Sequence, residues 1–467
     1  MRTLIATLAV LLSAAPVFAD FDTLLHAART KDLALVLSEL AAGTDPDPPS
    51  WHNGYAPLQF AAGNGDARMT TALLAAGADT EYRDHNGDRA LLWAAYSGTP
   101  ETVRLLLEAG SPADAHADPH GETPLMTASW YDHEEMVRLL LAAGADPNRR
   151  DQSSLTALHL AARSDNAALV RLLLDAGANP NVISESLYET PMHEAAARSV
   201  PAVVALLAAA HAVLEVRDHQ GLTPLHVAAV LGRSDNLRAL LAASADPDAV
   251  RPDGSTPILS ALAAQDQPGR TTVIALLAEI TDDKDRAFAA ALQRGEIATA
   301  LRLLERGTDV DARDAQGRAA LANAAQLPGM TMFHYLLLRG ADIDRVGGES
   351  LLAAAGAGNR GIVRDLLERG FDIEARDAYG RTPLLTAVVN HQPGTVELLL
   401  ASGADRHARD DGGEGAEELL ALADEPIRAE ISLSEQSAAW RPTEHLHAAL
   451  DGLRESREAI RRLLGLP

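Results

Sequence analysis

Cysteine is absent from the 467-residue sequence, and aromatic residues make up only 4 % of it. Without cysteine the chain can form no disulfide, no thiolate nucleophile and no Cys-ligated metal site. Apolar residues nevertheless reach 47 %, so a core must be built mainly from Ala, Leu and Val. Side chains of this size suit closely stacked helices better than a bulky globular core.

Basic residues are also scarce, because 40 Lys and Arg stand against 65 Asp and Glu and give a formal net charge of −25 at pH 7. An acidic surface of this size repels nucleic-acid phosphates and anionic lipid headgroups. We therefore expect no nucleic-acid partner.

A long apolar run occurs only at the start of the chain. The segment "MRTLIATLAVLLSAAPVFAD" has a basic Arg2, an apolar stretch over 4–12 and small residues before Ala19, which is the layout of a secretory signal peptide. A membrane anchor is the alternative, but a span needs roughly 18 apolar residues and Pro16 interrupts this one. We expect cleavage after Ala19, a periplasmic or secreted protein, and no membrane insertion once the signal is removed.

One phrase recurs through the rest of the sequence. "GLTPLHVAAV" at 221 matches a template whose copies begin at 53, 86, 120, 153, 187, 220 and 253, and again at 316, 347 and 379. The first seven starts are 33 or 34 residues apart, and a fixed period of this length indicates stacked repeats. The period therefore predicts one supersecondary unit per copy.

Each copy predicts two helices. Thr223 can cap the first helix and Pro224 can occupy its first turn, where a missing N–H costs nothing. A second apolar stripe at helical spacing follows, as in "LVRLLLDAGANPN" at 169. Gly177 suits the left-handed residue that ends a helix, and the polar residues after it suit a turn.

The period, the "TPLHVAA" opening and the "LLLDAGANPN" ending resemble ankyrin repeats over nearly the whole mature chain. The resemblance implies an all-α solenoid of about twelve helix-turn-helix units joined by short connecting segments, here called fingers. We expect the following division: signal peptide 1–19, N-terminal capping repeat 20–52, repeats 53–280, further repeats with a degenerate C-terminal cap 281–435, and an amphipathic helix 436–467.

The histidine of the repeated phrase has a structural role in ankyrin repeats, where its ring hydrogen-bonds the backbone that connects neighbouring units. The resemblance carries this role onto His159, His193 and His226. In the other units we expect packing alone to hold the layers together. In those units the position of the histidine, here called the histidine slot, holds Gln59, Leu92, Met126, Leu259, Ala322, Leu352 and Leu385.

The period fails between about 265 and 315, where the Gly-Ala-Asp turn and its finger are missing. A shortened unit in a continuous stack is one interpretation, and a hinge between sub-stacks 20–280 and 281–435 is the other. We favour the continuous stack, because the segment still supplies two helical patterns. The final amphipathic helix either covers the last repeat or binds a partner or a membrane surface.

No sequence motif for catalysis is present: the chain has no phosphate-binding Gly loop, no His-Glu-x-x-His pair and no Gly-x-Ser-x-Gly elbow. His116, Asp118 and His120 could gather on one fingertip near Asp132 and His133, and such donors suit zinc. Pro119 and the flexible tip disfavour a preformed site. We expect no metal, no cofactor and no enzymatic activity.

Aromatic residues are concentrated in units two to four. Three of the four Trp and four of the seven Tyr lie between Trp51 and Tyr131. In ankyrin repeats the fingertips and the end of the first helix line the concave binding surface, while Trp93 lies just inside it and suits the core. On this resemblance the protein-binding residues are Tyr55, His85, Tyr96, His120, Trp130 and Tyr131.

These observations predict a non-enzymatic scaffold that binds a protein of unknown identity outside the cytoplasm. The signal and architecture resemble periplasmic ankyrin proteins associated with peroxide defence, which implies support of a stress-defence enzyme. A secreted factor that binds host proteins is an alternative. A metal-dependent hydrolase on the same scaffold is a third.

Overall fold

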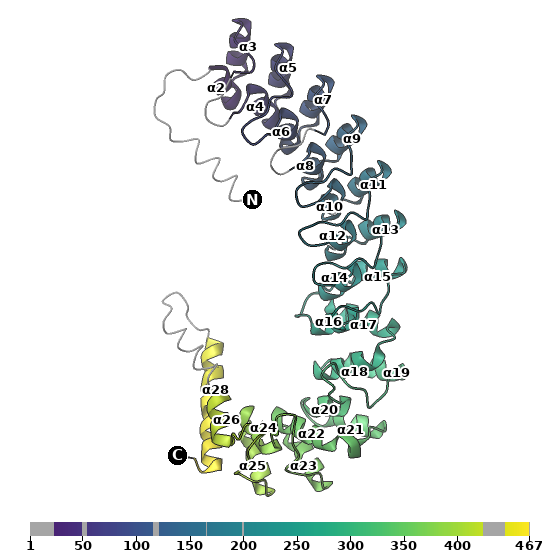
Figure 1. The fold of residues 1–467 in the computed structure, drawn as a ribbon, viewed down its shortest axis with the longest axis vertical. Helices are drawn as coiled ribbons and strands as arrows, with labels where there is room; N and C mark the ends of the chain where they lie inside the picture. Colours follow the sequence, from purple (N-terminus) through teal and green to yellow (C-terminus); the bar gives the residue numbers. More distant parts are fainter. Residues whose placement is uncertain are drawn as a thin grey trace. The chain divides into compact units, whose positions relative to one another are not determined.

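The computed structural model describes residues 23–48, 54–114, 121–164, 166–198, 200–423 and 444–466 (Figure 1). Its regular elements in these ranges are helices, and the one isolated β-bridge there joins Arg313 and Ala319. Backbone contacts divide the chain into two compact units, residues 1–246 and 247–467. The all-α repeat solenoid predicted from the sequence is confirmed.

The first unit contains seven helix pairs within its described residues. They are α2 Thr23–Thr30 and α3 Leu33–Ala41, α4 Pro57–Gly63 and α5 Ala67–Ala75, α6 Ala90–Ser97 and α7 Pro100–Glu108, α8 Pro124–Trp130 and α9 Glu134–Ala142, α10 Ala157–Ala162 and α11 Ala167–Asp175, α12 Pro191–Ala197 and α13 Pro201–Ala209, and α14 Pro224–Val230 and α15 Ser234–Ala242.

The second unit continues the pairing and ends in a longer helix. Its elements are α16 Pro257–Ala263, α17 Arg270–Ile280, α18 Lys284–Gln293, α19 Ile297–Glu305, α20 Ala320–Ala325, α21 Thr331–Leu338, α22 Ile343–Ala357, α23 Arg360–Glu368, α24 Pro383–Val389, α25 Pro393–Ala401, α26 Ala416–Ala423 and α28 Glu444–Leu464.

The helix ends follow from the local sequence. Proline occupies the first turn of α8 and α14, and the preceding Thr123 and Thr223 accept hydrogen bonds from the N–H groups of Met126 and His226. Thr190 stands at the same place before α12. The bonds to Thr123 and Thr223 satisfy backbone donors that a helix N-terminus otherwise leaves unpaired.

The core lies between successive layers. First helices pack against first helices and second helices against second helices throughout the first unit. Most first helices of the first unit bury a large apolar residue and a pair of alanines, such as Leu158, Ala161 and Ala162 in α10. The small alanine side chains let neighbouring helices approach closely, which explains how a chain with so few aromatics builds a continuous core.

Buried side chains connect one repeat to the next. His159 Nδ1 lies 3.2 Å from the Thr156 N and its Nε2 3.3 Å from the Glu189 carbonyl. His193 does the same with the Thr190 N at 3.2 Å and the Leu222 carbonyl at 3.1 Å. His226 Nδ1 lies 3.4 Å from the Thr223 N. The rings of His159 and His193 therefore connect two repeats, and the ring of His226 lies at the cap of its own helix.

Packing alone does not hold all the other layers, and the sequence expectation was wrong at two of them. Gln59 accepts from the Ala56 N–H at 2.7 Å and donates to the Asp88 carbonyl at 2.7 Å, because its amide offers the same acceptor and donor as a neutral imidazole. Where the slot holds Ala322, Glu349 of α22 instead accepts from the Ala319 N–H at 2.8 Å.

A second row of hydrogen bonds links the turns after the second helices. Asp47, Asn148 and Asn181 each accept a backbone N–H of the following repeat, at 2.7 Å in all three cases. In the second unit Asp311 accepts from the Asp342 N–H at 2.9 Å. The turn residues therefore form a second set of connections between neighbouring repeats.

The irregular segment 265–315 lies within the second unit. Only residues 281–283 separate α17 from α18, which explains the missing finger. In that unit α16 packs on α18 and α17 packs on α19, so the helix pairs remain stacked there. Arg270, the first residue of α17, is buried and donates to the carbonyls of Ala261 and Leu262 in α16, both at 3.0 Å.

The copy of the repeated phrase at 347 predicts a helix that starts within that phrase. In the structure the helix starts before the phrase, and this repeat has no finger. Helix α22 begins earlier, at Ile343, where the Asp342 side chain caps it. Gly347 is required within this helix, because a Cβ there would lie 2.1 Å from the ring of Phe371. The longer helix occupies the place of the finger.

Helix α28 packs against α25 and α26 in the second unit, with Ile460 and Leu464 buried. Residues 424–443, which include the predicted cap Thr443, lie outside the described residues. The buried positions agree with a helix that covers the last repeats.

Candidate protein-binding surface

Two tyrosines meet at the ends of neighbouring first helices. Tyr96 lies near the end of α6 and Tyr131 follows α8, and their ring centroids are 5.8 Å apart in an edge-to-face arrangement. The imidazole of His133 stacks on the Tyr131 ring, with the two ring centroids 5.9 Å apart. Both tyrosines remain exposed, at 44 % and 42 %, so the cluster is open to a partner.

Glu122 fixes the position of the Tyr96 ring. The Tyr96 hydroxyl donates to Glu122 Oε2 at 2.9 Å, and the Thr127 hydroxyl donates to Glu122 Oε1 at 2.8 Å. Burial of the hydroxyl and the neighbouring carboxylate together raise the pKa of Tyr96 far above its usual value. Tyr96 is therefore neutral and oriented before any partner arrives.

Trp130 supports a second contact. The guanidinium of Arg163 lies 5.1 Å from the centroid of the Trp130 ring, a cation–π arrangement. Arg163 Nε is 3.5 Å from Glu194 Oε2. Burial raises the pKa of Glu194, and the positive charge of Arg163 opposes that rise. Trp130 is 43 % exposed, so most of this arrangement is pre-formed while one part of the ring still faces solvent.

Tyr55 belongs to a separate aromatic group. Its ring centroid lies 5.2 Å from Trp93 and 5.5 Å from Phe60, both edge-to-face. Tyr55 and Trp93 are half-buried, so these residues contribute to packing. His85 is exposed and its ring lies beside Gly54, where an added Cβ would come within 2.5 Å.

The structure thus brings together Tyr96 and Tyr131, with Trp130 adjacent in the chain, and places Tyr55 and His85 on the preceding repeat. His120 lies outside the described residues, as do His116 and Asp118. No group of metal-binding side chains occurs among the residues that the structure describes. The protein-binding role of these residues remains a prediction.

Sequence reasoning missed Glu122, Arg163 and Glu194. The repeat alignment carried a signal for Arg163, because this residue, directly after α10, has the same place in the repeated phrase as Tyr96 and Trp130. The carboxylates gave no such signal, since acidic residues are common throughout the chain. Only the fold shows which of them meet the aromatic side chains.

An exposed tyrosine on a finger was also missed. Tyr188 has a positive φ of 56° and is 57 % exposed, whereas most other fingers have glycine at this turn, as at Gly87 and Gly221. Its neighbour Leu187 is 43 % exposed, and its carbonyl accepts from the His219 N–H at 3.1 Å. A bulky side chain in this conformation is unusual, and the neighbouring finger holds it in place.

The fold and this surface define a class of protein: a helical repeat solenoid with exposed aromatic side chains at the ends of its first helices. Ankyrin repeats (three copies) match residues 24–115, 58–151, 112–184, 158–251 and 321–410, which is more than half of the chain. The chain belongs to the ankyrin-repeat family. Repeats of this family are protein-interaction modules, and the chain is a repeat scaffold of that kind.

Curated relatives share only parts of their length with this chain. It is 37 % identical over 143 residues to a putative ankyrin repeat-containing protein of Treponema pallidum, covering 30 % of this chain and 48 % of the relative. It is 35 % identical over 105 residues to the B-cell lymphoma 3 protein homolog of Mus musculus, covering 22 % of this chain and 23 % of the relative. The chain thus spans less than half of the length of these relatives.

Solved structures of ankyrin domains are also similar. The human ASB11 ankyrin repeat domain has 29 % identity and a TM-score of 0.44, covering 49 % of this chain and 100 % of that domain. The ankyrin repeat domain of Bcl-3 has 25 % identity and a TM-score of 0.42, covering 48 % of this chain and 99 % of that domain.

Among the described residues, no helix combines the length and apolarity that crossing a bilayer requires.

Proposed function

We propose that this chain is a non-enzymatic scaffold that acts outside the cytoplasm and docks a partner protein on its second to fourth repeats. The observation that carries the proposal is the exposed Tyr96–Tyr131 pair beside Trp130. Tyrosine and tryptophan are enriched where interfaces concentrate their binding energy. Such a cluster is unusual in a chain with only 4 % aromatic residues.

Pre-organisation supports a binding role for this surface. Glu122 holds Tyr96 through a hydrogen bond, and Arg163 lies over Trp130. Side chains that are fixed before binding lose less conformational entropy when a partner docks.

The location outside the cytoplasm rests on the sequence of residues 1–19, whose layout is that of a signal peptide. We include a periplasmic stress-defence enzyme as the proposed partner, because the signal and the repeat architecture resemble periplasmic ankyrin proteins of that kind. The acidic balance of the chain, at −25, favours a partner surface with basic residues.

Affinity capture from a periplasmic extract tests the proposal. The wild-type chain and a Tyr96→Ala/Tyr131→Ala variant are immobilised in parallel, and the bound proteins are identified by mass spectrometry. A protein retained by the wild type and lost from the folded variant supports the site. Equal capture by both chains, or purification of the native protein only from the cytoplasm, contradicts the proposal.

A further inference from the structure

Helix α13 differs from the other second helices of the first unit. Its sequence, PAVVALLAA, has no charged residue, whereas each of the other six described in that unit contains at least one. The fifth residue is Arg138 in α9, Arg171 in α11 and Arg238 in α15, but Ala205 in α13. Ala205 is exposed, as is Ala209. A helix that is apolar on all sides is normally covered.

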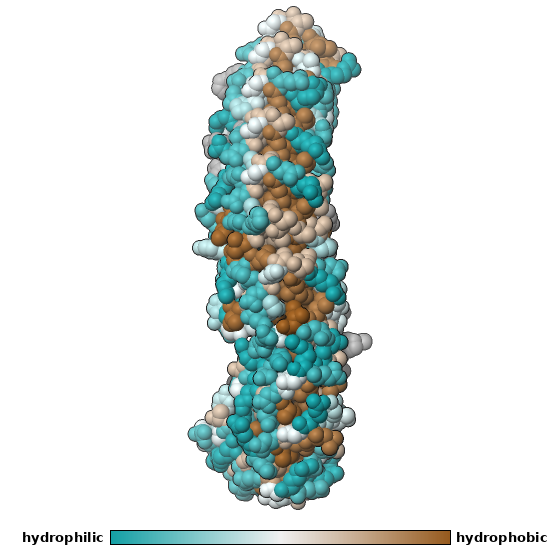
Figure 2. All heavy atoms as spheres, turned by 90° about the vertical axis from the view of Figure 1, so that its right-hand side faces the viewer, coloured by the Kyte–Doolittle hydropathy of each residue, from teal (hydrophilic) through white to brown (hydrophobic). Residues whose placement is uncertain are grey.

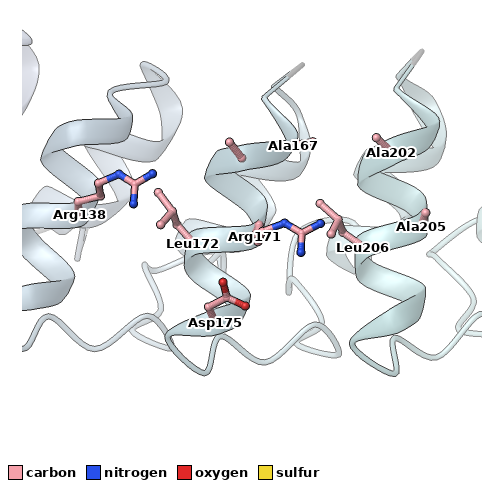
Figure 3. A pocket seen from close by; sticks show the side chains of 9 residues that line it. Arg138, Ala167, Arg171, Leu172, Asp175, Ala202, Ala205 and Leu206 are labelled. Atoms are coloured by element: carbon pink, nitrogen blue, oxygen red, sulfur yellow. The ribbon is translucent and has the colours of Figure 1, made fainter.

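Open grooves run along both sides of α13. One of about 690 Å³ lies between α9, α11 and α13, where Leu172, Ala202 and Leu206 line it (Figure 3). The other, of about 590 Å³, lies between α13 and α15. Figure 2 shows apolar residues forming a band along the face that the second helices present. The small alanines leave room for another helix to approach closely.

Two opposite charges beside the first groove have no ion-pair partner among the described residues. Arg171 and Asp175 are both exposed and lie one turn apart on α11. Figure 3 shows the Arg171 side chain extending toward Leu206 on α13. By contrast, Arg138 on the neighbouring helix pairs with Glu134 at 2.6 Å. The order of Arg171 before Asp175 is the less favourable one for pairing within a helix.

We propose that this face, formed by α11, α13 and α15, binds a second copy of the chain in a two-fold symmetric dimer. Antiparallel docking places Arg171 against Asp175 of the partner subunit and Asp175 against Arg171 of the partner subunit. Residues 205 and 209 occupy the same helical positions in α13 as 171 and 175 do in α11. The same symmetry therefore places Ala205 against Ala209 of the partner subunit.

Charge complementarity selects a second copy as the occupant. A two-fold interface uses the same patch twice, so it must be complementary to itself. Arg171 and Asp175 meet that requirement in the antiparallel arrangement, and the uncharged α13 adds apolar area beside the two pairs. The dimer face is built from second helices, whereas the proposed partner surface is built from the ends of first helices. The dimer does not depend on that partner.

Sedimentation of the purified full chain tests the dimer over micromolar to near-millimolar concentrations. The wild type is expected to reach twice the mass of one chain. Arg171→Asp brings two acidic residues together and Asp175→Arg brings two arginines together, and each is expected to weaken dimerisation about tenfold or more. The double variant Arg171→Asp/Asp175→Arg restores opposite pairs and is expected to recover most of the loss.

Ala205→Glu places a charge at the centre of the face and is expected to abolish the dimer. Arg68→Asp and Ala75→Glu, on exposed positions of α5 in the same unit, are the matched controls and are expected to leave it unchanged. Thermal unfolding of each variant establishes that it folds. A monomeric wild type throughout, a dimer insensitive to these changes, or failure of the double variant to recover would each overturn the proposal.

An effect of net charge alone gives a different pattern. Asp175→Arg makes the acidic chain less negative and would then strengthen association, whereas the proposed contact predicts weakening. Stronger association of Asp175→Arg than of the wild type would therefore also overturn the proposal.

Discussion

At the scale of single residues, the repeated histidine acts through its two ring nitrogens. One faces the cap of its own helix and the other faces a carbonyl of the next repeat, as His193 shows at 3.2 Å and 3.1 Å. Gln59 makes equivalent contacts in its own layer. The layer needs one acceptor and one donor at a fixed separation, and either side chain can supply them.

Substitution of His193 tests this role. His193→Ala leaves the buried Thr190 N–H without its acceptor and removes one contact to the Leu222 carbonyl, which keeps its bond from the Asp218 N–H. We therefore expect a loss of about 1–3 kcal/mol in the free energy of unfolding. His193→Gln should recover part of that loss, because glutamine fills the same slot at residue 59. Urea unfolding of the two variants measures both values. Equal destabilisation by Ala and Gln would contradict the hydrogen-bond explanation.

The buried histidines also predict acid sensitivity. Burial lowers the pKa of His159 from 6.5 to about 4, and it lowers the pKa of His193 as well. When folding lowers the pKa of a histidine, its contribution to stability is complete at a pH above the pKa of the unfolded state. This contribution is lost as the pH falls from the unfolded-state pKa to the folded-state pKa. For His159 the lowered pKa corresponds to about 3 kcal/mol between pH 6.5 and 4.

Denaturant unfolding between pH 7 and pH 4 measures this effect. The wild type should lose stability steadily over that interval, and a His159→Gln/His193→Gln variant should lose distinctly less. Identical pH profiles for the two proteins would show that other groups control the acid response.

At the scale of helices, binding and stability can be separated at the ends of α6 and α8. Tyr96, Trp130 and Tyr131 are each more than 40 % exposed, so truncation should disturb the core little. We expect Tyr96→Ala, Trp130→Ala and Tyr131→Ala each to weaken partner binding by about 2 kcal/mol or more where the residue is a hot spot.

Calorimetric titration with the captured partner and thermal unfolding should be measured on the same three variants. Leu240→Ala, at a buried position of α15, is the control: it should lower the unfolding midpoint and leave the affinity of the folded protein unchanged. Unchanged binding in all three surface variants would place the docking site elsewhere.

The sequence allowed the helix pairs and their caps to be predicted, because the apolar spacing and the Thr-Pro starts repeat at a fixed period. It did not reveal the early start of α22, since Gly347 and Gly348 discourage a helix unless a neighbour requires the space, as Phe371 does at Gly347. Tyr96, Trp130 and Tyr131 could be named from composition. Their partners Glu122 and Arg163 come from other repeats, and only the stacking brings them near.

At the scale of the whole molecule, the proposed function requires that the chain be exported. We expect the mature protein to begin at Asp20 and to be found in the periplasmic or culture fraction, because residues 1–19 have the charge and apolar layout of a signal peptide. N-terminal sequencing after cell fractionation measures both. Full-length protein with Met1 retained in the cytoplasm would contradict the expectation, and a cytoplasmic marker enzyme controls for lysis.

The two rows of hydrogen bonds between repeats have a mechanical consequence within each unit. Every such bond, from Asp47 to the Asp79 N–H or from His193 to the Leu222 carbonyl, joins a repeat only to its immediate neighbour. Tension applied along a unit is therefore carried in series through the described repeats, from each layer to the next. Because each repeat is held only by its neighbours, we expect a unit under tension to lose its repeats in succession and to regain them when the tension is released.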